Sequence, residues 1–507
     1  MFMSAPNSKR AAIRHLSLAA GLCGTAGLLS LLSACAVGPD FKRPDAPAVT
    51  HYTNGTDPSV TVSADGVAQK FAPGAKMAAD WWHLFHSPQL DAVIKEVVAG
   101  NPGLDAAQAS LKQAQDNLRS GYGVFYPQAG ADFDATRQKY SPLKFGQNAP
   151  ATLFNLFSLS GTISYALDIF GGERRTVEAL GAQADVQAAT ERATYITLVS
   201  NAADAVIAKA AYLAEIKATM ALIDVEKQQV ALSTVEFRAG TAPYSGVLSI
   251  ESQLQAYEAT LPGLRQQVAQ ADDLLAALAG HVPAEWQAPT IDLADLTLPD
   301  DLPVSLPSDL VRQRPDILAA EATAHGASAE IGVATAAMLP NVTLGAGYGA
   351  NATAMSSLFA SKGHAWNVGA DVAQPIFQGG TLWFKRKAAI DSYKQSMALY
   401  RQTVLGAFQQ VSDTLQALDH DAQTLAAQEA AFKTADEALR LVQINYRSGL
   451  VNYLAVITAD AQYHQAMIAE LQAKAVRYQD TVALFVALGG GWWNADAETA
   501  EVGGLKR

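Results

Sequence analysis

The sequence predicts a mixed α and β membrane protein in which four membrane-crossing strands per chain lead into long paired helices. Three observations predict this fold class. The body of the 507-residue chain contains an internal repeat of two units. Each unit has two segments of alternating polarity and a very long stretch without proline. Because four strands are too few to enclose a wide pore, the prediction includes the association of several identical chains.

The composition limits the class of protein before any motif is considered. The formal net charge is −12, so a nucleic-acid partner is not expected. The two cysteines, Cys23 and Cys35, lie near the N-terminus, which leaves the body without a disulfide framework or a cysteine metal site. No apolar run after residue 35 reaches the roughly 18 residues of a spanning helix, so a barrel of strands is the remaining way for the body to cross a membrane.

Residues 1–34 have the layout of an export signal, because three basic residues and no acidic ones precede an apolar stretch. Cys35 follows small residues and resembles the lipidated cysteine of bacterial lipoproteins. The alternative is a plain signal peptide or membrane anchor with an incidental cysteine. Two or three acyl chains would attach the protein firmly to a membrane. Ala36, rather than an aspartate, follows the cysteine, which indicates the outer membrane.

Ordered landmarks of one half recur in the other roughly 210 residues later. The matched pairs are Asn101-Pro102 with Arg314-Pro315, Pro127 with Pro340, Phe170-Gly171-Gly172 with Phe377-Gln378-Gly379-Gly380, Phe237-Arg238-Ala239-Gly240 with Tyr446-Arg447-Ser448-Gly449, and Leu278-Ala279-Gly280 with Ala487-Leu488-Gly489. The prolines between the halves indicate a linker. The predicted organisation is an export signal at 1–34, a lipidated N-terminal segment at 35–100, a first repeat at 101–280, a linker at 281–307, a second repeat at 308–490 and a tail at 491–507.

The alternating segments predict the strands. Along residues 157–169 the odd positions are apolar, aromatic or glycine and the even positions are small or polar, and residues 131–136 share this period of two. In the second half, residues 341–348 and 366–372 alternate in the same way. The pattern is typical of the lipid-facing and lumen-facing sides of a membrane barrel. The alternative is a soluble sandwich of two sheets.

Each half also predicts a short helix and a long one. The short helices, 102–125 and 315–338, begin at a proline, which the first helical turn tolerates. The stretches 173–236 and 379–446 contain no proline, so each predicts a helix of roughly 100 Å that ends in a glycine-bearing turn and is followed by a returning helix. An apolar seam with coiled-coil spacing runs along the second of them, through Val404, Phe408, Val411, Leu415, Leu418, Ala422 and Leu425.

Several motifs together resemble the TolC family of outer-membrane efflux proteins, and within it the NodT-type lipoproteins. The motifs are Cys35-Ala36-Val37-Gly38-Pro39, Trp81-Trp82-His83-Leu84-Phe85, Ser164-Tyr165-Ala166-Leu167-Asp168, Arg312-Gln313-Arg314-Pro315-Asp316 and Ala487-Leu488-Gly489-Gly490. Each motif alone is weak evidence, but their order over nearly all of residues 35–493 is specific to the family.

The resemblance implies a homotrimer whose chains share one outer-membrane barrel that continues into a helical barrel in the periplasm. It also implies a periplasmic adaptor protein and an inner-membrane transporter of the resistance-nodulation-division class as partners, with outer-membrane lipid around the strands. The duct would passively conduct small molecules, such as drugs, toxic organic compounds or metal ions, and would use no cofactor. The substrate itself is not predicted.

The family's gate lies at the periplasmic tip of the long helices. The matching residues here are Phe237, Arg238, Gly240, Tyr446, Arg447, Gly449, Leu450, Val451 and Leu454. Many members carry an acidic ring just beyond, but this chain has Ala455 and Thr458 there, and Asp460 is the nearest acid. One interpretation is an apolar constriction, which can gate by excluding water. The other is that the apolar residues only pack the turn. Arg238 and Arg447 could pair with acids across the tip or contact the adaptor.

Catalytic motifs are absent from the sequence, so an enzyme is not expected. His83 and His86 have a spacing that could bind a metal, but the aromatic residues around them favour a packed segment. Asp272 and Asp273 are assigned to a solvated helix face. Two other functions remain open: an outer-membrane factor for type I protein secretion, and a periplasmic coiled-coil lipoprotein that spans nothing.

Overall fold

The structure is a computed structural model that describes residues 36–495. Its contacts divide the chain into two compact units. Of the described residues, the sheet unit comprises 36–43, Gln113–Asp185 and Glu321–Ala398, and the helical unit comprises Pro44–Lys112, Val186–Ala320 and 399–495. The predicted export signal, Cys35 and most of the predicted tail lie outside the described residues.

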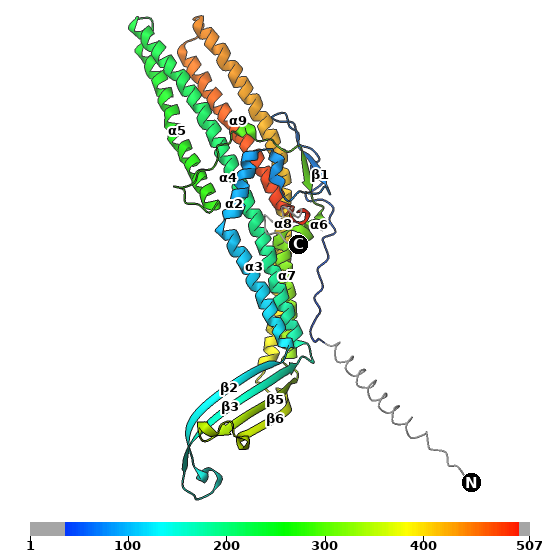
Figure 1. Ribbon diagram of the computed structural model, residues 1–507. Helices are drawn as coiled ribbons and strands as arrows, with labels where there is room; N and C mark the ends of the chain where they lie inside the picture. Colours follow the sequence, from blue (N-terminus) through cyan, green and yellow to red (C-terminus); the bar gives the residue numbers. More distant parts are fainter. Residues whose placement is uncertain (1–35, 496–507) are drawn as a thin grey trace, which may run out of the picture. The chain divides into compact units, whose positions relative to one another are not determined.

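The sheet unit contains one antiparallel four-stranded sheet in the order β2-β3-β5-β6 (Figure 1). The strands are β2 (Gln128–Tyr140), β3 (Thr152–Leu167), β5 (Asn341–Ala352) and β6 (His364–Ala373). The two halves of the repeat meet at the pairing of β3 with β5. All four predicted strands are present, and the sheet leaves β2 and β6 as its two edges.

The alternation places apolar side chains on the surface of this sheet rather than inside a core. Trp366 lies opposite Tyr348 in the register, and their exposed fractions are 75% and 58%. Val368, Val372 and Phe133 are also more than half exposed. Among the described residues, no second sheet packs on these strands, so the soluble sandwich is wrong.

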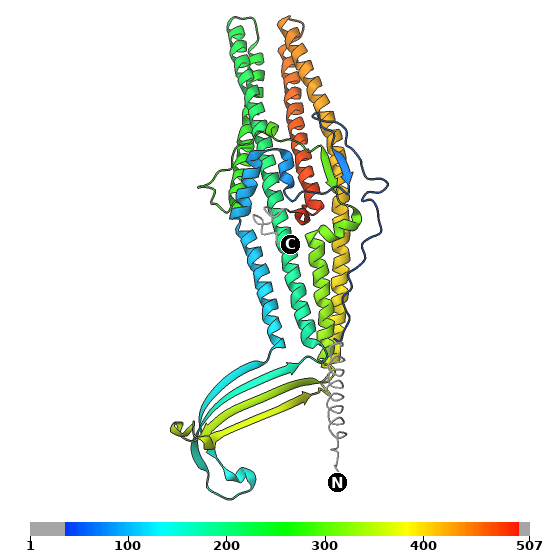
Figure 2. The ribbon, with the colours of Figure 1, turned by 45° about the vertical axis from the view of Figure 1, so that its right-hand side comes forward.

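The long helices have equal lengths in the two halves. α4 (Gly172–Arg238) and α8 (Thr381–Arg447) each have 67 residues, and the returning helices α5 (Tyr244–Leu278) and α9 (Tyr453–Ala487) each have 35. Figure 2 shows α4 beside α5 in green and α8 beside α9 in orange and red. This equality confirms the internal repeat. No helix among residues 36–495 is both long enough and apolar enough to cross a membrane.

The short helices are close to their predictions. α3 (Pro102–Gly121) ends in a turn of 3₁₀ helix at Tyr122–Phe125, and α7 covers Pro315–Ala336. The seam of α8 is confirmed, because six of its seven positions are buried. The seventh, Phe408, is partly buried and its ring lies 5.5 Å from that of Tyr52.

The N-terminal segment builds much of the core of the helical unit. A 3₁₀ turn at Trp81–Phe85 leads into α2 (Pro88–Gly100), and Trp81, Trp82 and Phe85 are buried. The Trp81 ring stacks on Phe485 of α9 at 5.2 Å. His83 points its Nδ1 at Asp91 at 2.8 Å. Within the described part of the chain, no group of three potential ligands is placed to hold a metal ion.

The proline-rich stretch between the repeats does more than connect them. β4 (Asp301–Val304) pairs in parallel with β1 (Lys70–Pro73), and α6 (Pro307–Gln313) follows. Seven buried residues of the stretch belong to the main core, namely Ala288, Ile291, Leu293, Leu296, Leu298, Leu302 and Val304. The domain boundary at 281–307 stays a prediction, but these residues are part of the packed helical unit.

Candidate functional site

The tip of the first helical hairpin is the turn between α4 and α5. Gly240 has φ +74°, its N–H donates to the carbonyl of Phe237 at 2.9 Å, and the N–H of Thr241 donates to Glu236. This left-handed residue after the last helical turn ends the helix, and glycine takes that conformation without the steric cost that a side chain adds. Phe237 and Tyr244, whose rings lie 5.1 Å apart, are both exposed.

The second tip repeats the geometry. Gly449 has φ +75° and donates to the carbonyl of Tyr446 at 2.9 Å, while the side chain of Asn452 accepts a hydrogen bond from the N–H of Ala455 and begins α9. A Cβ on either Gly240 or Gly449 would meet no atom within 4 Å. The backbone conformation, not lack of space, therefore explains the two glycines that the repeat places at matching positions.

Apolar side chains project from the second tip. Leu450 is 74% exposed and Leu454 is 63% exposed, whereas Val451 is half-buried. Within one chain Leu450 and Leu454 do not pack the turn, which disfavours the interpretation that they serve only local packing. Their place in a constriction stays a prediction, because that depends on neighbouring copies of the chain.

The two tips meet across a cleft of about 780 Å³ in the helical unit. Tyr446 and Tyr453 line it from one hairpin, and Glu236, Ser245 and Ser249 line it from the other. The hydroxyl of Tyr446 lies 3.5 Å from the Glu236 carboxylate, and burial together with that carboxylate raises the pKa of Tyr446. This hydroxyl is therefore protonated at neutral pH and donates across the cleft.

The two tip arginines, Arg238 and Arg447, are both exposed, and Arg447 lines the cleft. Within the described part of the chain neither of them forms an ion pair. Both predicted roles, pairing with an acid across the tip and contact with the adaptor, stay predictions.

Asp460, the acid nearest to the tip, lies inside the chain. Its exposed fraction is 4%, and the hydroxyl of Tyr257 on α5 donates to its Oδ2 at 2.6 Å. Glu226 on α4 is equally buried, and after burial the charge of Asp460 contributes to raising its pKa. Sequence reasoning did not find this group. The sequence did show acids on the apolar faces of long helices. That pattern identifies a buried acidic group only when it is known which helices pack against one another.

The assignment of Asp272 and Asp273 to a solvated helix face was wrong for Asp272. Asp272 is half-buried and accepts a hydrogen bond at 2.6 Å from the buried ammonium of Lys209 on α4, while Asp273 is exposed as predicted. Lys209 also donates to the carbonyl of Ala288 at 3.0 Å. The lysine is 63 residues from Asp272, so no local pattern shows the pair.

The predicted lipidation site, Cys35, lies outside the described residues, but the residues after it are fixed to the sheet unit. The N–H of Val37 donates to the carbonyl of Phe170 at 2.9 Å. Arg175 on α4 donates to Asp40 at 2.6 Å, and the Phe41 ring stacks on His325 of α7 at 4.7 Å. The N-terminal segment therefore begins beside the turn that joins β3 to α4.

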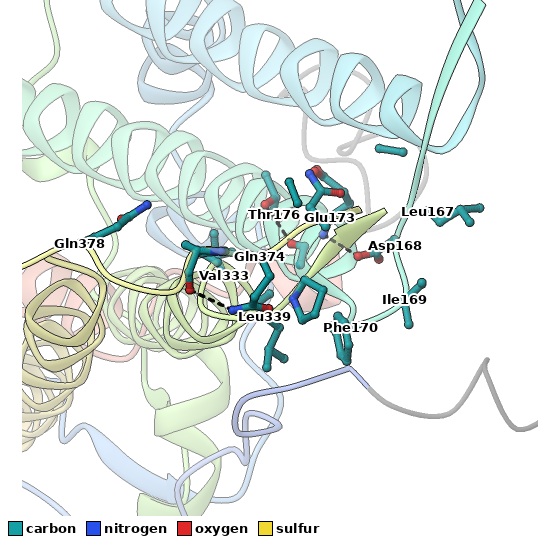
Figure 3. A pocket seen from close by; sticks show the side chains of 18 residues that line it. Leu167, Asp168, Ile169, Phe170, Glu173, Thr176, Val333, Leu339, Gln374 and Gln378 are labelled. Atoms are coloured by element: carbon teal, nitrogen blue, oxygen red, sulfur yellow. Dashed lines mark hydrogen bonds between the residues drawn. The ribbon is translucent and has the colours of Figure 1, made fainter. Parts of the chain in front are cut away.

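A pocket of about 700 Å³ lies at the same turn (Figure 3). Asp168 accepts hydrogen bonds at 3.0 Å from the N–H groups of Glu173 and Arg174 and from the Arg174 guanidinium. A carboxylate at the first turn of α4 satisfies free N–H groups and the helix dipole. Most of the other lining residues are apolar or carry amides, so the pocket is a strand-to-helix connection rather than a catalytic cleft.

Comparison with known proteins was made by sequence and by structure. The model of the family described as outer membrane efflux protein matches residues 93–281 and 306–490. The toluene efflux pump outer membrane protein TtgC of Pseudomonas putida is 29% identical over 92% of this chain and 96% of its own length. The pyoverdine export outer membrane protein OpmQ of Pseudomonas aeruginosa is 30% identical over 83% of this chain and 90% of its own. The outer-membrane channel OprN superposes with a TM-score of 0.81 at 25% identity, over 90% of this chain and all of that one.

Proposed function

The chain belongs to the outer membrane efflux protein family, and on that premise we propose that it is the exit duct of a three-part pump that opens at its helical tips. Its fold is the TolC-like fold of the outer-membrane channels, and it acts in efflux at the outer membrane. This family membership favours a channel over the coiled-coil lipoprotein that spans nothing. Its relatives are named as efflux and export proteins rather than as enzymes.

The open apolar sheet carries the proposal. In the described part of the chain no further strand pairs with β2 or β6, and Trp366 and Val368 are 75% and 74% exposed. Exposed strand edges pair with further strands, and exposed apolar faces of this size need lipid or protein to cover them. A homotrimer, in which the sheets of three chains close on one another, satisfies both edges and leaves the apolar face to lipid.

We assign the constriction to Leu450 and Leu454, which are the most exposed apolar side chains at the second tip. Phe237, Tyr446, Val451 and the two tip glycines would shape the turns around it. An apolar ring in a narrow pore excludes water and ions until it widens. Without an exposed acid at the positions of Ala455 and Thr458, cation binding would not be the means of closure.

We assign Arg238 and Arg447 to contact with the periplasmic adaptor, since both guanidinium groups are exposed and neither has an acid partner in the described part of the chain. The adaptor would connect the duct to an inner-membrane transporter of the resistance-nodulation-division class. The cargo is small molecules. The relatives are named for different cargoes, from toluene to pyoverdine. The choice of cargo is therefore assigned to the partners of the duct rather than to the duct itself.

Single-channel recording of the purified, acylated protein in planar bilayers tests this assignment. The wild-type channel should be mostly closed, and Leu450→Ser with Leu454→Ser should raise its open probability. Leu441→Ser, which alters an exposed leucine inside α8 rather than at the tip, is the matched control and should leave the recording unchanged. Equal recordings from all three proteins would remove the two leucines from the gate, and no conductance from any of them would contradict the channel.

A further inference from the structure

Three helices of the helical unit bring a buried acidic pair together. Glu226 comes from α4, Asp460 from α9 and Tyr257 from α5, and each is 4% exposed. Tyr257 donates to Asp460 Oδ2 at 2.6 Å, and the same carboxylate contributes, after burial, to raising the pKa of Glu226, which places the two acids side by side. Oε2 of Glu226 has no hydrogen-bond partner among the described residues. The group therefore joins the α4–α5 hairpin to the α8–α9 hairpin.

Within residues 36–495, neither acid forms an ion pair with a basic side chain. The groups that face them are the hydroxyls of Tyr257 and Tyr453 and the imidazole of His464, whose pKa is lowered by burial. His464 Nε2 lies 3.4 Å from Thr219 Oγ1, so the ring has a neutral partner. Burial raises the pKa of Tyr463, further along α9, and the charges of Asp436 on α8 and of Asp460 and Glu470 on α9 raise it further.

The lysine that follows Glu226 in the sequence is engaged elsewhere. Lys227, the residue after Glu226, pairs with Glu258 on α5 at 3.1 Å, and both of these side chains are partly exposed. Two carboxylates in contact inside a protein cannot both carry their charge without a cation, so one holds a proton. The proton of the pair is placed on Glu226, because the raised pKa belongs to that carboxyl. Burial and the charge of Asp460 raise the pKa of Glu226 to about 7.

We propose that Glu226 and Asp460 form a proton-dependent latch that holds α9 against α4 and α5. With one proton shared, the Glu226 carboxyl donates to Asp460 and the three helices stay packed. When that proton leaves, two adjacent charges occupy a site without a counter-ion, and separation of α9 from α4 lets water solvate both. The latch weakens as pH rises.

The pH dependence of the latch can be calculated from the raised pKa of Glu226. If opening returns the carboxyl from a pKa of about 7 to its ordinary 4.5, raising the pH from about 6 to about 8 favours the opened state by about tenfold. The sign is fixed by the direction of the shift: a raised carboxyl pKa stabilises the packed state at low pH, and this stabilisation is lost as pH rises through about 7.

Hydrogen–deuterium exchange of the intact, acylated protein measures the latch directly. The readout is the protection of residues 453–463 of α9 at about pH 6 and pH 8, corrected for the intrinsic pH dependence of amide exchange. We expect about tenfold lower protection at the higher pH in the wild type. Glu226→Gln keeps a hydrogen bond to Asp460 but cannot ionise, so its protection should not change with pH.

Glu215→Gln is the matched control. Glu215 is another buried acid of α4, but it hydrogen-bonds with Gln472 rather than with a carboxylate, so this variant should keep the wild-type response at residues 453–463. If Glu226→Gln does not assemble, Asp460→Asn tests the same pair. Equal corrected protection at the two pH values in the wild type, or an undiminished pH response in Glu226→Gln, would overturn the latch.

The effect on conduction rests on the proposed function of the tips, and a second measurement separates the two. In planar bilayers the open probability should rise with pH for the wild type and not for Glu226→Gln. A pH-dependent exchange signal without a change in conduction would uphold the latch and contradict the tip as gate. A conduction change without the exchange signal would contradict the latch.

Discussion

Arg477 holds the N-terminal segment to α9, and its removal should release that segment. The guanidinium is 1% exposed and donates to the carbonyls of Ala64 and Val67, at 3.0 Å and 3.2 Å, and to the side chains of Thr61 and Gln69. These four bonds join α9 to residues that lie more than 400 positions earlier in the chain.

The cost of Arg477→Ala can be worked from these contacts. Ala64 and Val67 keep the bonds between their own backbone groups, so neither carbonyl loses its last partner. Each of the four bonds contributes on the order of 1 kcal/mol, and water entering the vacated space recovers part of the sum. We expect local opening to become easier by about 3 kcal/mol, which is about a hundredfold in the opening equilibrium.

Limited trypsin digestion reports this opening at Lys70, an exposed residue of β1 next to the anchored segment. Cleavage of a transiently opened segment follows the population of the open form. The cleavage rate after Lys70 should rise about a hundredfold in Arg477→Ala and should stay at the wild-type value in Arg265→Ala, an exposed arginine of α5. Wild-type cleavage of Arg477→Ala would refute the anchoring role.

Three further predictions concern the tip turns, the helical core and the N-terminus. Gly449→Ala, at φ +75°, should cost about 1 kcal/mol of thermal stability, whereas Gly406→Ala inside α8 should gain about as much; equal effects would contradict the conformational explanation. Burial, and after it the neighbouring Asp480, raise the pKa of Asp421 to about 7, so the stability that protonated Asp421 contributes is lost as pH rises through 7. The melting temperature of Asp421→Asn should therefore fall less than that of the wild type between about pH 5 and pH 8, and an equal fall in both proteins would contradict this. Cys35→Ser should abolish incorporation of labelled palmitate, and residual labelling would disprove acylation at this residue.

Much of the fold could be predicted because its signals are local or repeated. The period of two around Trp366 and Val368, and the 4-3 seam that contains Val411 and Leu418, each depend on residues a few positions apart. The recurrence of the turns at Gly240 and Gly449 then identifies both halves as one unit. Such patterns report which face of an element is apolar, and they need no knowledge of the partner element.

The groups that escaped prediction depend on contacts between distant segments. Asp460 accepts its hydrogen bond from Tyr257, which lies 203 residues earlier in the chain. The position of Asp460 within α9 therefore could not predict this buried hydrogen bond. Asp272 was assigned to a solvated helix face, but the buried Lys209 that pairs with it belongs to α4, 63 residues earlier in the chain. The stretch that contains Leu302 was interpreted as a linker from its prolines, and the contribution of its apolar residues to the core of the helical unit could not be seen from the prolines alone.

The number of chains in the native particle is the most direct test, because each chain supplies one four-stranded sheet with two free edges. Native mass spectrometry of the acylated protein, released from outer membranes in a mild detergent, measures that number. We expect a single species of three chains that conducts ions after reconstitution. A stable single chain that stays in solution without detergent or lipid would contradict the shared barrel and the function built on it.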